Sequence, residues 1–174
     1  MFGFGSKKKK IINQFITMIQ SVMGTYMIMR SLSTHRFEET KLEPLGVKIF
    51  EACYILGVID CIGAAIDLEG KIIDQKLIIE ACEDCSIGMK IFDEKDASGM
   101  FQFAMLFIKE GNAAHKLQYY GGKDAQTCIN AMLDGKDSSE AAKADSARTK
   151  NKVGETLRGY AKSRFRQAEA SRYG

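Results

Sequence analysis

The sequence has no tryptophan, a single proline and only two histidines among its 174 residues. So little proline excludes collagen-like and proline-rich chains, and it argues against a sheet-rich protein, which needs many tight turns. Hydrophobic residues make up 45% of the chain and charged residues 27%, which is ordinary for a globular protein. A chain of this length buries a core without disulfide bonds, so the composition predicts one soluble domain with additional arms.

The familiar sequence signatures of catalysis are also missing. There is no P-loop, no GxSxG or HExxH motif and no glycine fingerprint for dinucleotides. The two histidines, His35 and His115, have no serine or cysteine nearby at a recognised nucleophile spacing. The sequence therefore gives no positive support for an enzyme and predicts no cofactor, although catalytic sites also assemble from residues far apart in the chain.

Five cysteines, an odd number without regular spacing, indicate a reducing compartment and a cytoplasmic protein. Cys82 and Cys85 form an isolated CxxC pair, but the two acidic residues between them oppose the thiolate that a redox pair requires. A zinc site needs two further ligands, and no second paired spacing supplies them. We therefore favour small buried thiols over a redox or zinc site.

Charge is distributed unevenly along the chain, whose formal net charge is +3. Lys7, Lys8, Lys9 and Lys10 carry four positive charges, and residues 148–174 hold eight basic and two acidic residues. Residues 11–147 hold thirteen basic and twenty acidic residues, a net charge of −7. Basic ends of this kind contact phosphates, anionic lipid or an acidic protein, or they remain beside the chain's own acidic body.

Apolar residues recur at helical spacing, and no segment shows sustained β-strand alternation. Pro44 suits a first helical turn, and Asp74 suits a helix N-cap. We expect Gly121 and Gly122 to break one helical segment into two. The sequence thus predicts an all-α fold, a compact bundle of about five or six helices at residues 8–30, 45–66, 75–89, 97–109, 113–120 and 125–133.

Composition divides the chain into four parts. Residues 1–10 are a basic N-terminal arm, and residues 11–135 are the helical bundle domain. Residues 136–152 lack large apolar side chains and form a linker, helical or disordered. Residues 153–174 place apolar residues at helical spacing among basic ones, which predicts a basic amphipathic C-terminal tail that orders on a surface.

An uncharged stretch from Ile11 to Met29 follows the lysine run and is nearly long enough to cross a bilayer. Polar residues interrupt it, and its apolar residues follow helical spacing, which favours an amphipathic core helix. The alternative is a helix lying on a membrane surface with the lysines at lipid headgroups. The stretch from Ala52 to Ile66 contains Asp60 and is too short to span, so it indicates a buried helix. The predicted location is cytoplasmic, or peripheral at the membrane.

Asp67 and Glu69, in the turn before Gly70, form a candidate metal site. An EF-hand loop is excluded, because its first and twelfth positions would be Ala65 and Lys76, which carry no carboxylate. A weak cation site at Asp67 and Glu69, or an ordinary turn in solvent, are the two interpretations.

The segment from Ala64 to Leu77, AAIDLEGKIIDQKL, joins an apolar helix to an amphipathic one. It resembles the turn of TerB-type tellurite-resistance domains, in which an alanine-rich helix ends in Asp-Gly-x-Ile/Val and an acidic capped helix follows. Glu69 stands in place of the usual Asp and Lys76 in place of the usual Glu. The resemblance covers about residues 45–133, with a second related turn at residues 106–112. It implies an all-helical fold and a stress- or membrane-linked interaction role rather than a reaction.

Three functions fit these features. The first is a non-catalytic interaction module whose basic C-terminal segment engages an acidic protein surface. The second is a nucleic-acid-binding protein whose tail aromatics stack on bases. The third is a peripheral membrane protein of a stress response, with the N-terminal lysines on anionic lipid. Each is compatible with a homo-oligomer. The candidate partner-binding residues are Arg158, Tyr160, Lys162, Arg164, Phe165 and Arg166, and the candidate anionic-surface residues are Lys7, Lys8, Lys9 and Lys10.

Overall fold

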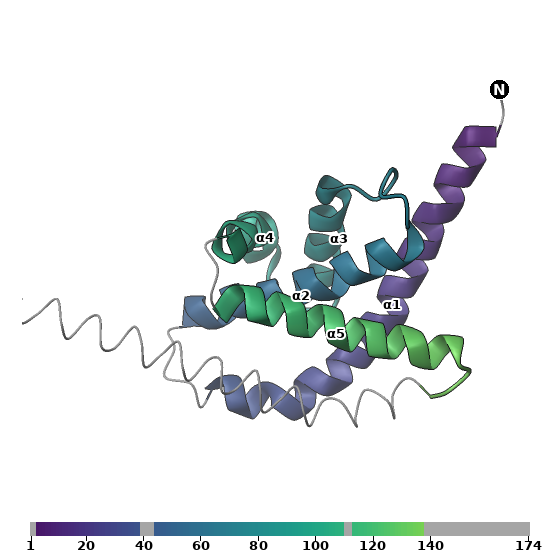
Figure 1. Ribbon diagram of the computed structural model, residues 1–174. Helices are drawn as coiled ribbons and strands as arrows, with labels where there is room; N and C mark the ends of the chain where they lie inside the picture. Colours follow the sequence, from purple (N-terminus) through teal and green to yellow (C-terminus); the bar gives the residue numbers. More distant parts are fainter. Residues whose placement is uncertain (1–2, 39–43, 110–112, 138–174) are drawn as a thin grey trace, which may run out of the picture.

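The computed structural model describes residues 3–38, 44–109 and 113–137, which form helices and short connections and contain no strand. The helices are α1 (Gly3–Glu38), α2 (Pro44–Ile66), α3 (Gln75–Gly88), α4 (Glu94–Lys109) and α5 (Ala113–Leu133), as Figure 1 shows. The prediction of an all-α helical bundle is confirmed. The linker from residue 138 onward and the tail at 153–174 lie outside the described residues.

Helix α2 forms the centre of the bundle and packs against each of the other four helices. Its sequence is apolar nearly all round, and every residue from Glu51 to Ile59 is buried. The stretch Lys48–Ile66 is the one part of the described chain that is long and apolar enough to cross a membrane. Because the other helices cover most of it, α2 has the burial of a core helix, as predicted. Asp60 lies on the exposed side of this helix, and partial desolvation raises the pKa of its carboxyl group.

Helices α2 and α5 cross at two glycines, where their backbones are in direct contact. A Cβ atom placed on Gly57 would lie 1.9 Å from the carbonyl oxygen of Gln118, and one on Gly121 would lie 2.1 Å from the carbonyl oxygen of Tyr54. Both distances are far below van der Waals contact, so only glycine permits this crossing. The Tyr54 hydroxyl also donates a hydrogen bond to the Asp124 carboxylate across the same interface.

The predicted break at Gly121 and Gly122 is wrong, because α5 continues without interruption from Ala113 to Leu133. Neither glycine has a positive φ, so the pair does not end a helix. Glycine inside a helix costs about 1 kcal/mol relative to alanine. The close packing of α5 on α2 offsets that cost. The rule that paired glycines end a helix therefore fails here.

Helix α1 is longer than expected at both ends. The helix predicted from residue 8 begins at Gly3, within the predicted arm, and the loop expected after Arg30 is helical as far as Glu38. No glycine or proline lies between Thr25 and Pro44, so the chain contains no strong helix breaker there. Figure 1 shows α1 changing direction along its length, and two side chains near Gly24 hydrogen-bond to backbone carbonyls one turn earlier, an arrangement that bends helices.

The apolar face of α1 lies against the core, as predicted for residues 11–25. Phe15, Ile19, Val22 and Met23 are all buried. Ile16, another apolar residue at this helical spacing, is instead 49% exposed. The core interpretation of this helix is therefore confirmed for these residues, with Ile16 as the exception.

Helices α3 and α4 pack against α2 and against each other. Asp74 caps α3 as predicted, its side chain accepting a 2.9 Å hydrogen bond from the Leu77 N–H. An ion pair of 2.5 Å joins Lys48 of α2 to Asp96 in the first turn of α4. Phe103 lies at helical spacing with the core residues of α4, yet it is 52% exposed and stacks on Phe107 with a centroid distance of 6.4 Å.

Candidate functional site: a basic groove along helix α1

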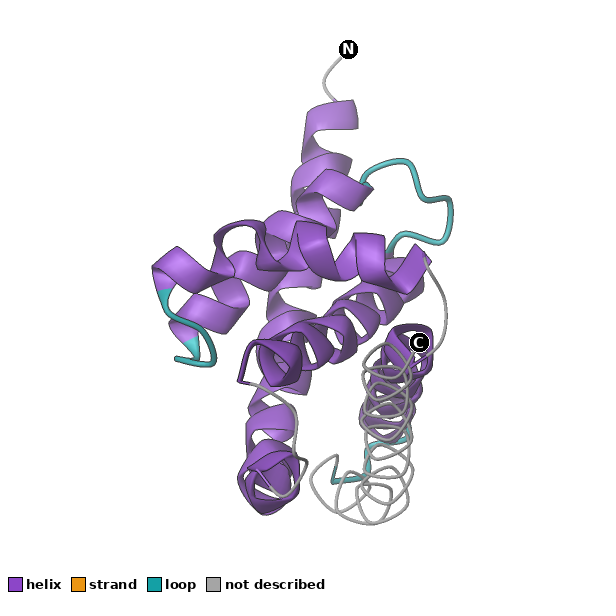
Figure 2. Ribbon diagram, turned by 90° about the vertical axis from the view of Figure 1, so that its left-hand side faces the viewer, coloured by secondary structure: helices purple, strands orange, loops and turns teal. Residues whose placement is uncertain are grey.

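The four N-terminal lysines form an exposed cationic end of the molecule. Both views show the first turns of α1 extending beyond the other helices (Figures 1 and 2). Lys7, Lys8, Lys9 and Lys10 are all exposed, and no ion pair joins any of them to a described carboxylate. Because successive residues of a helix are about 100° apart, four consecutive lysines surround the helix instead of sharing one face. Together with backbone hydrogen bonds, Lys7 also acts on the Asp67 carboxyl group and helps to lower its pKa. The exposed lysines are otherwise open to a partner from several directions.

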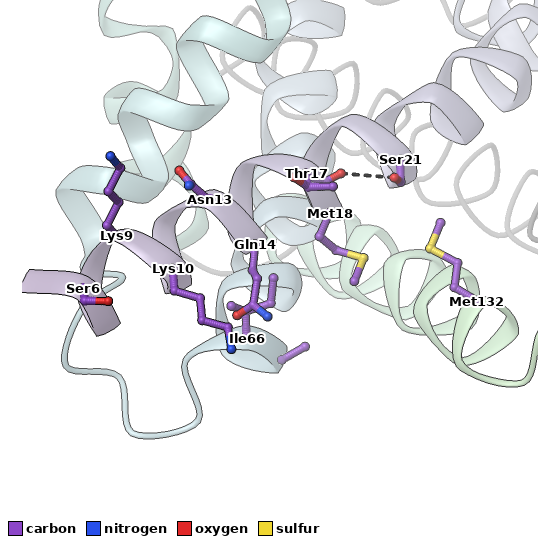
Figure 3. A pocket seen from close by; sticks show the side chains of 11 residues that line it. Ser6, Lys9, Lys10, Asn13, Gln14, Thr17, Met18, Ser21, Ile66 and Met132 are labelled. Atoms are coloured by element: carbon purple, nitrogen blue, oxygen red, sulfur yellow. Dashed lines mark hydrogen bonds between the residues drawn. The ribbon is translucent and has the colours of Figure 1, made fainter. Parts of the chain in front are cut away.

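An open groove of about 1000 Å³ runs along α1 beside these lysines. Helix α1 supplies one long wall, and the carboxyl ends of α2 and α5 supply the other (Figure 3). The wall from α1 is cationic at its start and otherwise mostly uncharged and polar, whereas the opposite wall is apolar. The lining residues are Ser6, Lys9, Lys10, Asn13, Gln14, Thr17, Met18, Ser21, Ala65, Ile66 and Met132.

The side chains divide the groove into a cationic end and an apolar end. Lys10 and Gln14 point towards Ile66, whereas Lys9 points to the other side of α1 (Figure 3). Met18 and Met132 point towards one another from α1 and α5. Unbranched thioether side chains adapt to irregular apolar groups, so this part of the groove suits contact with another protein.

Lys10 also lies near the carboxyl end of α2, where the last carbonyl groups carry a partial negative charge. The partial negative charge of the α2 end attracts the Lys10 ammonium group but does not neutralise it. Lys10 remains exposed, so its charge is accessible from the groove. The partial negative charge at this end of α2 is therefore favourable to a cation at Lys10.

Asp67, one of the two candidate metal ligands, has a structural role in the turn after α2. It is buried, and its Oδ2 accepts hydrogen bonds from the N–H groups of Ile72 at 2.6 Å and Ile73 at 2.8 Å. These bonds, first that from Ile73 and then that from Ile72, lower the pKa of the Asp67 carboxyl group. Glu69 is exposed and pairs with Lys71 at 3.0 Å.

The described residues contain no group of three or more His, Cys, Asp or Glu side chains arranged to hold a metal ion. Asp67 and Glu69 are therefore not joined by a third possible metal ligand within the described residues. The geometry of Asp67 is accounted for by the backbone groups that it binds.

The cysteine pair in α3 has the surroundings of structural thiols. Cys82 is fully buried, and burial raises its pKa well above the usual range. Burial, with a smaller contribution from Asp84, raises the pKa of Cys85 to about 11. A thiol with such a pKa is protonated at neutral pH and is a poor nucleophile. The interpretation of this pair as small buried thiols agrees with these surroundings.

The structure brings only some of the sequence-predicted site residues together. Lys9 and Lys10 line the groove, whereas Lys7 and Lys8 lie beside it at the same end of α1. The candidate partner-binding residues of the tail lie outside the described residues: Arg158, Tyr160, Lys162, Arg164, Phe165 and Arg166.

Sequence reasoning missed the other residues of the groove, notably Gln14, Met18, Ile66 and Met132. For the α1 residues, the one signal in the sequence was the uncharged polar face that follows the lysines along this helix. The opposing wall comes from the ends of two distant helices, which no local pattern identifies. Comparison with known protein families, with curated proteins and with solved structures finds no match to this chain.

Proposed function

We propose that the protein is a non-catalytic helical interaction module that engages an acidic protein surface through its basic ends. The observation that carries this proposal is the cationic end of α1, where four exposed lysines extend from an acidic body without an ion pair to a described carboxylate. Opposite charges on two protein surfaces accelerate their encounter and fix their relative orientation. The groove beside the lysines adds apolar contact area, which charge alone does not supply.

The basic C-terminal segment is the second part of the same proposal. Arg158, Lys162, Arg164 and Arg166 add four positive charges at the other end of the chain. Two cationic segments on one molecule increase the apparent affinity for an extended acidic partner. The resemblance of residues 45–133 to TerB-type domains, which implies an interaction role, supports the same class of function.

An anionic membrane is the second candidate partner. Phe2 and Phe4 precede the lysine run in the sequence, and aromatic residues beside a polybasic segment are typical of peripheral membrane attachment. Phosphatidylserine vesicles therefore belong in the test beside an acidic polypeptide.

The test measures binding of the full chain to polyglutamate, to phosphatidylserine vesicles and to single-stranded RNA. We expect replacement of Lys7, Lys8, Lys9 and Lys10 by glutamine to weaken polyglutamate binding about tenfold, or about 1.4 kcal/mol. A matched control removes the same charge from the body, at the exposed residues Lys76, Lys95, Lys109 and Lys116. We expect this control to change binding less than threefold.

Equal weakening in the two variants would show that net charge, and not the end of α1, controls binding. Loss of vesicle or RNA binding in the N-terminal variant, with polyglutamate binding unchanged, would assign the lysines to lipid or nucleic acid and would overturn the proposal. Repeating the titration at higher salt measures the electrostatic share of each affinity.

A further inference from the structure

We infer that the groove beside α1 receives an acidic amphipathic α-helix of a partner protein, with its apolar face on Met18 and Met132 and its carboxyl end at Lys10. This inference rests on the proposed function, because it specifies the form in which the acidic partner is recognised. Three features of the groove support the inference. These are its length, its division into an apolar and a polar wall, and the lysine at one end.

The length of the groove matches a short helix. Its lining extends along α1 from Ser6 to Ser21, which at 1.5 Å per residue is about 22 Å. A partner helix of about 15 residues, or four turns, has the same length. Amphipathic helices commonly bind in apolar grooves between helices and place residues three and four apart on the groove floor.

The chemistry of the two walls matches the two faces of such a helix. Ala65, Ile66, Met18 and Met132 offer apolar contacts from three different helices. On the α1 wall, the Gln14 amide lies opposite Ile66 (Figure 3). It can hydrogen-bond to polar side chains beside the apolar face of the partner helix. The partner helix is thus expected to be apolar on one side and polar on the flank that meets α1.

The position of the lysines sets the direction of the partner helix. Lys10 points into the start of the groove and Lys9 lies at its edge, whereas the lining near Ser21 and Met132 is uncharged. The carboxyl end of a helix carries a partial negative charge, and glutamates in its last turns add to it. The partner therefore lies antiparallel to α1, with its carboxyl end at the lysines.

The same walls argue against two other occupants. A lipid acyl chain would cover Gln14 and Thr17 with hydrocarbon and leave their polar groups without partners there. A nucleic acid binds single strands largely by stacking bases on aromatic side chains, and the eleven lining residues include no aromatic residue.

The test uses the full chain and three labelled peptides of about 15 residues. The acid-last peptide has leucine and alanine on one face and glutamates in its last two turns. The acid-first peptide has the same face with the glutamates in its first two turns. The apolar-free peptide keeps the glutamates of the acid-last peptide but has glutamine in place of leucine. Fluorescence anisotropy measures each affinity.

We expect the acid-last peptide to bind about tenfold more tightly than either of the other two. Lys10→Glu and Met132→Glu are each expected to weaken its binding about tenfold. Gln14→Glu is a second groove variant at an exposed position, where unfolding is not expected, and it should weaken binding by charge repulsion. Lys76→Glu, at an exposed α3 residue that does not line the groove, is the matched control and should leave binding within about twofold.

Equal affinity of the acid-last and apolar-free peptides, with both sensitive to Lys10→Glu, would overturn the groove inference while the proposed function stands. Equal affinity of the acid-last and acid-first peptides would overturn the assigned direction. Absence of binding by all three would overturn the groove inference, and the polyglutamate titration would then decide the proposed function separately. Phosphatidylserine vesicles that displace the peptide and lose binding in Gln14→Glu would make lipid the occupant and would also overturn the inference.

Discussion

At the scale of single residues, Asp67 shows how one carboxylate organises a turn. The chain leaves α2 at Ile66 and must reverse before α3, and the N–H groups of Ile72 and Ile73 would otherwise be unpaired within this turn. The charged Asp67 oxygen binds both of them. Hydrogen bonds to a charged acceptor are stronger than those to a neutral one, so this residue holds the α2–α3 connection in place.

We predict that Asp67→Asn lowers the stability of the protein at neutral pH and removes part of its acid sensitivity. The pKa of Asp67 is lowered by folding, so its stabilising contribution is present above about pH 4, the usual range of an aspartate, and is lost as the pH falls through the lowered pKa. Urea unfolding at pH 7 and pH 3 should show a difference between the variant and the parent that shrinks in acid. Glu69→Gln, in an exposed ion pair, is the control. An equal difference at both pH values would contradict the role of the charge.

At the scale of secondary-structure elements, the crossing of α2 and α5 determines how the bundle closes. The two helices approach so closely that backbone atoms of one occupy the space of a side chain on the other at Gly57 and Gly121. A buried Tyr54–Asp124 hydrogen bond lies at the same crossing. This contact brings the end of α5, with Met132, to the groove beside α1.

We predict that Gly57→Ala and Gly121→Ala each destabilise the protein by at least ~2 kcal/mol, because the added methyl group forces the backbones apart. Gly24→Ala in α1 is the matched control, since a Cβ there meets no atom within 4 Å. Removing an exposed glycine from a helix should stabilise the protein by about 0.5–1 kcal/mol. Thermal melting followed by circular dichroism measures all three. Destabilisation by Gly24→Ala equal to that of Gly57→Ala would show that the loss does not arise from the crossing.

At the scale of the whole molecule, positive charge is concentrated at the two ends of the chain and negative charge between them. The buried apolar residues of the described chain lie between Phe15 and Ala131, within the predicted bundle domain. The acidic body carries a net charge of −7 over residues 11–147, and the eight basic residues of the last segment follow it. The composition of residues 136–174 predicts a tail outside this core, and a terminal segment of that kind is removable without loss of the fold.

We predict that a chain ending at Ala147 still melts cooperatively, with a Tm within about 4 °C of the full chain. The same truncation should weaken binding to polyglutamate, because it removes six net positive charges. Melting by circular dichroism and binding by anisotropy check the two halves of this prediction. Loss of a cooperative transition would show that residues 148–174 belong to the core.

Much of the architecture was predictable because it depends on local patterns. Helical spacing identified the core face of α1, Pro44 marked the start of α2, and Asp74 marked the N-cap of α3. The errors arose where a neighbouring helix changes the meaning of a residue. Gly121 was assigned to a helix end but packs against α2, and Phe103 has the spacing of a core residue but is half exposed.

The groove lay beyond prediction for the same reason. The lysines were visible as a run of four, but Ile66 and Met132 reach them only because α2 and α5 end beside α1. The sequence by itself determined the helices, their apolar faces and the segregation of charge, since each depends on residues close together in the chain. The tertiary structure alone decided which helix ends meet, because that depends on how closely distant backbones approach at glycine.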